Sequence, residues 1–201
     1  MSSNHRRYSE TGLPWHVVEE AINRETEWLQ TVIDQTIVDR VPGCDDCMYT
    51  YRKIAVLIIT GKIKAKEFIA TRGHDLWDDL TQKHALKRSA RHGGDWHKRM
   101  MDVITEYFVS DGFEVIAEPF LSQGRADLGI HKNGRMDLFV EIGTMSAHKL
   151  WWNLQVLTNC TVALVPDEKR VIEFICGPWP RGTATRQLNE DWPEIRDATA
   201  Y

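Results

Sequence analysis

Two carboxylates stand inside apolar segments of the chain, where a negative charge needs a partner. Asp127 lies in R-A-D-L-G-I-H and Glu141 lies in L-F-V-E-I-G, and both segments have the composition of buried strands. A carboxylate in such surroundings is costly unless it is paired or binds a metal. Two hard oxygen ligands suit Mg²⁺ or Mn²⁺, and such an ion can activate water for attack on a phosphodiester. The other interpretation is that one carboxylate reaches solvent or pairs with Arg125 or Lys149.

The turn between these two segments decides which side chains can meet. Asn133-Gly134 is the strongest local turn signal in the chain and predicts a hairpin. A two-residue loop would pair apolar side chains with polar ones, whereas an odd-length loop places Asp127 opposite Glu141 and gathers the apolar side chains on one face. We therefore expect an odd loop, with Leu128 opposite Val140, Ile130 opposite Leu138, and an apolar face formed by Leu128, Ile130, Leu138, Val140 and Ile142.

The elements that must position these residues follow from the periodicity after Gly94. The pattern predicts a helix, three strands, a helix and two strands: 96–110 with Asp95 as N-cap, then 113–120, 125–131, 136–143, 147–157 with Ser146 as cap, 160–165 and 170–175. Three consecutive strands favour a meander, and the second helix favours a parallel crossover. The sequence therefore predicts an α/β (α+β) fold with a mixed central sheet.

The first 92 residues have the spacing of helices rather than strands. Helices are predicted over 14–39, from after Cys47 to Thr60, over 63–70 and over 74–89. Three regions result: a helical N-terminal region (1–92), a core (93–177) and an irregular, proline-containing tail (178–201). The stretch 54–73, an apolar helix followed by Gly61 and a basic segment, also resembles a helix–turn–helix.

Charge is unevenly distributed over the 201 residues, although the net charge is only −4. The segments 52–72 and 83–99 each have a net charge of +5, which suits contact with phosphates or a solvated helix face. Arg91, Lys98 and Arg125 are the side chains expected to contact nucleic acid. No apolar run approaches about 18 residues and the N-terminus lacks a signal-peptide pattern, so we expect no membrane contact and a cytoplasmic location.

Four cysteines are present. Cys44 and Cys47 form a single C-x-x-C, which is half of a Zn²⁺ site and needs further ligands. A local disulfide or two free thiols in a turn is the other interpretation. Cys160 and Cys176 lie in apolar strand-like segments and are expected to be buried.

Residues 95–175 resemble the PD-(D/E)XK nuclease superfamily, which has an αβββαβ core. That superfamily includes archaeal Holliday-junction resolvases, restriction-type enzymes and nuclease-like proteins of archaeal viruses. G-R-A-D, ending at Asp127, stands where the family has its P-D. V-E-I-G stands where the family has (D/E)-x-K, with Gly143 in the lysine position. Some relatives have V-E-x-G and a lysine on the following helix, and Lys149 matches that variant.

The resemblance implies roles for individual residues. Asp127 and Glu141 would bind Mg²⁺ or Mn²⁺, and Lys149 would orient the attacking water or stabilise the developing charge. Gln155 would be a polar helper on the same helix. His97 would be a metal-proximal group or general base, with Asp102 and Glu106 as alternatives.

The resemblance also implies a function. It is that of a metal-dependent DNA endonuclease that acts as a homodimer, with branched or junction DNA among the substrates that the resemblance suggests. A catalytically inactive DNA-binding or assembly protein on the same fold is the first alternative. A transcription regulator that uses residues 50–92, with the αβ region for dimerisation, is the second.

Overall fold

The structure is a computed structural model that describes residues 14–33, 36–37, 45–69, 94–132, 137–167 and 170–177. The side chains of residues 45–47 and of Ile69 are outside this description. The predicted helix over 74–89, the Asn133-Gly134 turn and the tail after 177 lie outside the described residues. Cys44 and Arg91 lie outside them as well.

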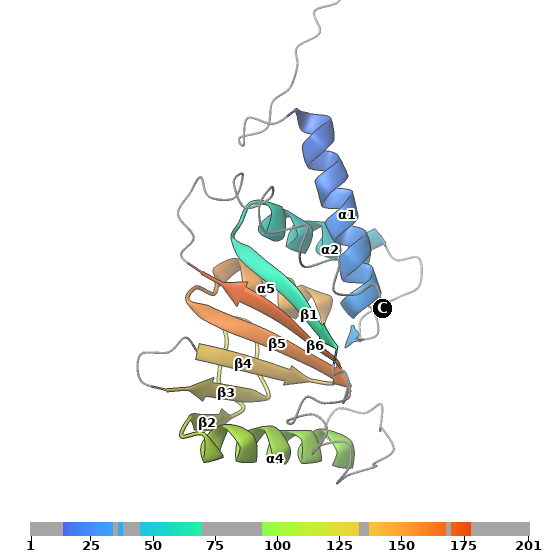
Figure 1. Cartoon of the computed structure of the whole chain (residues 1–201). Coiled ribbons are helices and arrows are strands. Elements are labelled where there is room, and N and C mark those ends of the chain that lie inside the picture. Colours follow the sequence, from blue (N-terminus) through green and yellow to red (C-terminus); the bar gives the residue numbers. More distant parts are fainter. Residues whose placement is uncertain are drawn as a thin grey trace, which may run out of the picture.

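A six-stranded mixed sheet forms the centre of the molecule (Figure 1). The strands are β1 (Ile63–Ile69), β2 (Glu114–Ala117), β3 (Leu128–His131), β4 (Asp137–Ile142), β5 (Cys160–Asp167) and β6 (Arg170–Cys176). Their order is β1-β6-β5-β4-β3-β2, and only the β4–β5 pair is parallel among these strands. The predicted α/β (α+β) class with a mixed sheet is confirmed.

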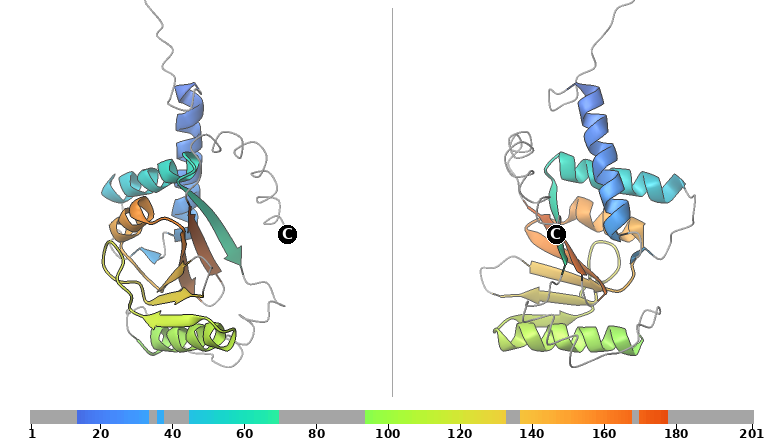
Figure 2. Two further views of the ribbon diagram at one scale, coloured as in Figure 1. Left: turned by 90° about the vertical axis from the view of Figure 1, so that its left-hand side faces the viewer. Right: turned by 45° about the vertical axis from the view of Figure 1, so that its right-hand side comes forward.

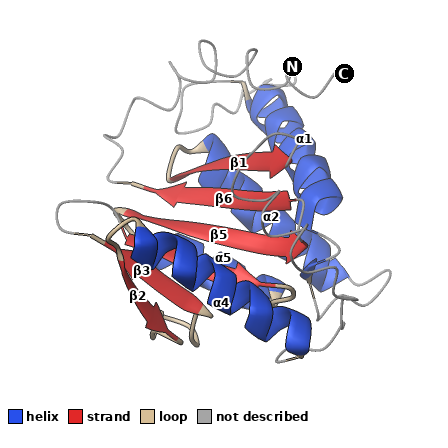
Figure 3. Cartoon of the chain, turned by 60° about the horizontal axis from the view of Figure 1, so that its bottom comes forward, coloured by secondary structure: helices blue, strands red, loops and turns tan. Residues whose placement is uncertain are grey.

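Helices cover both faces of the sheet. α4 (Asp95–Ser110) packs on one face through Trp96, Met100 and Ile104 (Figure 3). α1 (Trp15–Ile33), α2 (Asp45–Ile59) and α5 (Ala147–Val156) share a second core on the other face, where α2 and α5 lie side by side (Figure 2). The molecule therefore has two cores with the sheet between them.

The predicted order of elements from residue 95 onward is confirmed, and so is the register of the central hairpin. Leu128 pairs with Val140 and Ile130 pairs with Leu138, as the odd-length loop requires. The predicted apolar residues of β3 and β4 all pack in the α4 core. Hydrophobic patterning was sufficient here because a slip of one residue would have turned every apolar side chain to the wrong face.

The prediction of a helix over 63–70 is wrong. This segment is strand β1, which pairs antiparallel with β6 from Ile63–Cys176 to Ile69–Arg170. Lys, Ala and Glu favour helices in isolation, but pairing along β6 overrides that preference. The helix–turn–helix interpretation of 54–73 is therefore wrong as well, because its second helix is absent.

Three smaller predictions about element ends are also corrected. α1 ends at Ile33 rather than Asp39, and β2 ends at Ala117 because Glu118 takes a left-handed conformation with φ of 50°. The N-cap of α4 is Gly94, so Asp95 lies in the first turn, where its charge still complements the helix dipole. Ser146 caps α5 as predicted and accepts a hydrogen bond from the backbone N–H of Lys149.

Candidate active site

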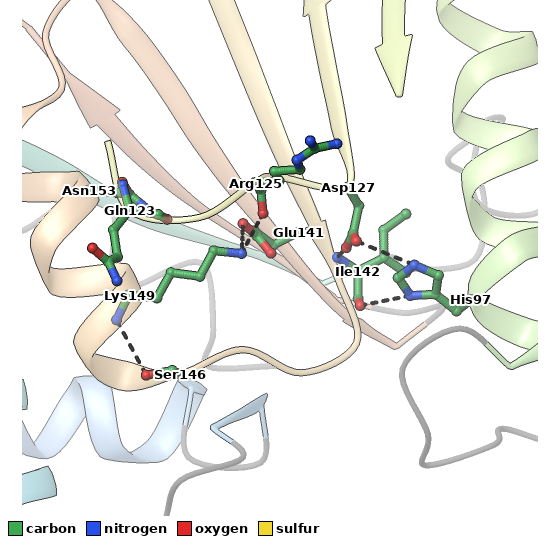
Figure 4. Close-up of polar contacts among 9 residues, drawn as sticks. All are labelled: His97, Gln123, Arg125, Asp127, Glu141, Ile142, Ser146, Lys149 and Asn153. Atoms are coloured by element: carbon green, nitrogen blue, oxygen red, sulfur yellow. Dashed lines mark hydrogen bonds and ion pairs between the residues drawn. The ribbon is translucent and has the colours of Figure 1, made fainter. Parts of the chain in front are cut away.

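Glu141 is a buried carboxylate held by an ammonium group. Its side chain on β4 is 5% exposed, and Nζ of Lys149 lies 2.7 Å from its Oε1 (Figure 4). The same Nζ donates a hydrogen bond of 2.6 Å to the backbone carbonyl of Arg125. Lys149 is on α5, so the β4–α5 connection brings the carboxylate and the ammonium of this ion pair together. The charge of Glu141 therefore has a partner from the next element of the chain.

The environment of Glu141 still favours its protonated form. The pKa of Glu141 is raised to about 7, chiefly by burial and to a smaller extent by the negative charge of Asp127, while Lys149 acts against both effects. Among the described residues, the ammonium of Lys149 is the group that contacts Oε1. A carboxylate has more lone pairs than this one contact uses, so it can also accept another positive group.

Asp127 and His97 form a second pair beside the same strand. Asp127 lies one residue before β3, and its Oδ2 accepts a hydrogen bond of 2.6 Å from the backbone N–H of Ile142. Nε2 of His97 is 3.4 Å from Oδ1, and its Nδ1–H donates to the carbonyl of Ile142 over 3.2 Å. Figure 4 shows both contacts. Both ring nitrogens of His97 therefore face oxygen acceptors, one on Asp127 and one on Ile142.

His97, the residue expected near the metal, lies in the interior of the protein. The side chain is 7% exposed and lies on the face of α4 that packs on the sheet. It touches Asp127 rather than solvent, so its contact is with a predicted metal ligand. The alternatives Asp102 and Glu106 are both exposed on α4. Of the three, His97 is the one that is buried and contacts Asp127.

A buried asparagine that the sequence analysis missed holds the loop before Asp127. The side chain of Asn153 is on α5, where its Oδ1 accepts from Gln123 N–H at 2.8 Å and its Nδ2 donates to Gln123 C=O at 3.0 Å. Asn153 follows Leu150 and precedes Leu154 on the apolar face of the helix. A polar amide at a buried helical position was the available signal, because such a group needs a partner.

Gly143 explains why this chain has no lysine at the position that the resemblance assigns to one. Its φ is +84°, and its backbone N–H donates to Val165 C=O over 2.8 Å. Only glycine adopts this conformation without strain. A lysine here would be strained whatever the space around it, and Lys149 supplies an ammonium to Glu141 from the following helix instead.

The remaining predicted residues have exposed side chains. Gln155 is exposed on α5, and Lys98 is exposed on α4. Arg125 is half exposed, with its guanidinium 3.5 Å from Glu118. In the basic segment 52–72, Arg52 bonds Asn23 and Lys62 bonds the carbonyl of Leu157, so these two cations have partners within the protein.

The donor set fits a hard divalent cation in part. Asp127 and Glu141 both offer carboxylate oxygens. Mg²⁺ is commonly held by one or two carboxylates, with waters and substrate phosphates as the other ligands. In the part of the chain that the structure describes, no group of three or more His, Cys, Asp or Glu side chains is placed to hold a metal. A complete protein cage of the kind that structural Zn²⁺ needs is therefore absent from those residues.

Comparison with protein-family models, curated proteins and solved structures found no match. The resemblance to the PD-(D/E)XK superfamily therefore stays a prediction from the residues. Among the described helices, none has the length and apolarity needed to cross a membrane.

Proposed function

We propose that this protein is a metal-dependent phosphodiester hydrolase that acts on DNA. The observation that carries the proposal is the buried Glu141 carboxylate, paired with Lys149 and electrostatically coupled to Asp127. Buried, interacting titratable groups of this kind are concentrated at functional sites. The order of helices and strands around these residues agrees with the expectation from the resemblance. So does the element that supplies each of the three side chains.

Each residue has a role that follows from its contacts. Asp127 and Glu141 would hold Mg²⁺ or Mn²⁺, which when bound supplies an activated water and neutralises charge on the phosphate. Glu141 must first lose its proton, and Lys149 is beside it to stabilise the negative charge. His97 and the backbone N–H of Ile142 hold both oxygens of Asp127, which fixes the carboxylate in place. Lys149 is also a cation near the position where phosphate charge would develop.

Cleavage of branched and linear DNA in Mg²⁺ tests this proposal. We expect Asp127→Asn and Glu141→Gln each to lower the cleavage rate by at least about 100-fold, because each removes a charge at the reacting centre. Glu106→Gln is the matched control, since Glu106 is an exposed carboxylate on α4. Failure of the wild-type protein to cleave, or equal activity in Glu141→Gln, would contradict the enzymatic proposal.

One observation favours a second candidate, a DNA-binding or assembly protein without catalysis. The Lys149–Glu141 ion pair gives the buried carboxylate a partner without any metal. This alternative predicts DNA binding that is unchanged by Mg²⁺ and by Glu141→Gln. The hydrolase predicts Mg²⁺-dependent cleavage instead. A homodimer is expected in either case from the resemblance, and light scattering after size exclusion measures it.

A further inference from the structure

One large apolar side chain is presented to solvent beside the candidate active site. Phe120 is 77% exposed, more than any other large hydrophobic side chain of the described residues. It belongs to the connection between β2 and β3, where it forms an isolated antiparallel bridge with Arg125. A ring this exposed keeps most of its surface available to a partner outside the chain.

The backbone around Phe120 is fixed rather than loose. Asn153 binds both backbone groups of Gln123, and Lys149 binds the carbonyl of Arg125. The N–H of Leu121 donates to the carbonyl of Gly124, whose φ is +76°. A Cβ at Gly124 would lie 3.4 Å from Cε of Lys149, so the tip is packed closely on α5. The ring is therefore presented on a rigid support.

A cation accompanies the ring. The guanidinium carbon of Arg125 lies 4.1 Å from the centroid of Phe120, and the Arg125 side chain is 50% exposed. Nη1 of Arg125 is also 3.5 Å from the exposed carboxylate of Glu118. An aromatic face next to a guanidinium plane matches the two parts of a nucleotide, a base to stack and a phosphate to neutralise.

We propose that Phe120 and Arg125 bind an unpaired base of the DNA substrate, with Phe120 stacking on the base. This inference rests on the proposed function and specifies its substrate class as DNA with unpaired bases, such as a bubble or a branch. The faces of bases inside a continuous duplex are already stacked, so a rigid ring gains contact where a base is exposed. The backbone carbonyl of Arg125 binds Lys149, and Lys149 contacts Glu141, so the stacked base would lie next to the candidate active site.

Fluorescence of 2-aminopurine in a DNA bubble, measured in EDTA, tests the inference without cleavage. Wild-type protein is expected to change the 2-aminopurine emission and to bind the bubble more tightly than the matched duplex. Phe120→Ala is expected to lose the emission change and to weaken bubble binding about tenfold, since base stacking on one aromatic ring is typically of that size. Phe120→Trp should restore both. Tyr107→Ala, at an exposed aromatic position on α4, is the matched control.

The outcomes separate this inference from the proposed function. Equal bubble binding by wild type and Phe120→Ala, or equal weakening of bubble and duplex, would overturn the inference. A change of oligomeric mass in Phe120→Ala with unchanged DNA binding would also overturn it, because the partner would then be a second copy of the chain. Phe120-dependent stacking in EDTA without cleavage in Mg²⁺ would support the inference while contradicting the hydrolase.

Discussion

Glu141 makes the stability of the metal-free protein depend on pH. Its native pKa is about 7 against an ordinary value of 4.5, so the folded protein binds this proton more tightly than the unfolded chain does. The contribution of Glu141 to the stability of the folded protein is therefore greatest below about pH 4.5. This contribution is lost as the pH rises through 7. The full difference is about 3 kcal/mol.

We expect wild type in EDTA to lose that stability relative to Glu141→Gln between pH 4.5 and 8, because the glutamine has no proton to release. Chemical denaturation of both proteins across this range measures the difference. At pH 8, Mg²⁺ should raise the melting temperature of wild type and leave that of Glu141→Gln unchanged, since binding to the native state stabilises it. A difference between the two proteins that stays constant with pH would contradict the prediction.

The α5 helix positions the loop before Asp127 as much as it supplies Lys149. Asn153→Ala would leave the backbone N–H and C=O of Gln123 without their side-chain partner. We expect a loss of about 2 kcal/mol in the free energy of unfolding and faster hydrogen exchange at the Gln123 amide, because two hydrogen bonds worth about 1 kcal/mol each are lost. Gln155→Ala is the control on the same helix. Unchanged protection of the Gln123 amide in Asn153→Ala would contradict this role.

The sequence predicts some elements better than others. The physical reason is the distance along the chain between an element and the contact that fixes its structure. The β3–β4 register was predictable because Leu128, Ile130 and Val140 must share a face across a short turn. β1 was not, because its partner β6 is remote in sequence and its own residues favour a helix. Asn153 was missed because its partner is the backbone of a loop, which has no residue-specific signature.

At the scale of the whole molecule, the N-terminal region completes the same structure that contains the candidate active site. β1 forms the edge of the sheet next to β6, and α1 and α2 share the core with α5. We expect the fragment 93–201 to fail to fold, because Leu154, Ile172 and Phe174 would lose their cover. Circular dichroism and dye binding on the fragment measure this. A cooperative unfolding transition of the fragment would show instead that it is an independent domain.

The pairing of β1 with β6 also bears on the time that the chain needs to fold. Ile63 pairs with Cys176, more than a hundred positions later. Closing so long a loop is entropically unfavourable, and sheets with such remote pairings fold slowly. During synthesis, β1 leaves the ribosome well before its partner strand exists, so its apolar residues must wait uncovered. Of the described strands, β6 is the last to be synthesised and it pairs with β1, the first, so a nascent chain that stops before β6 leaves β1 without its partner strand.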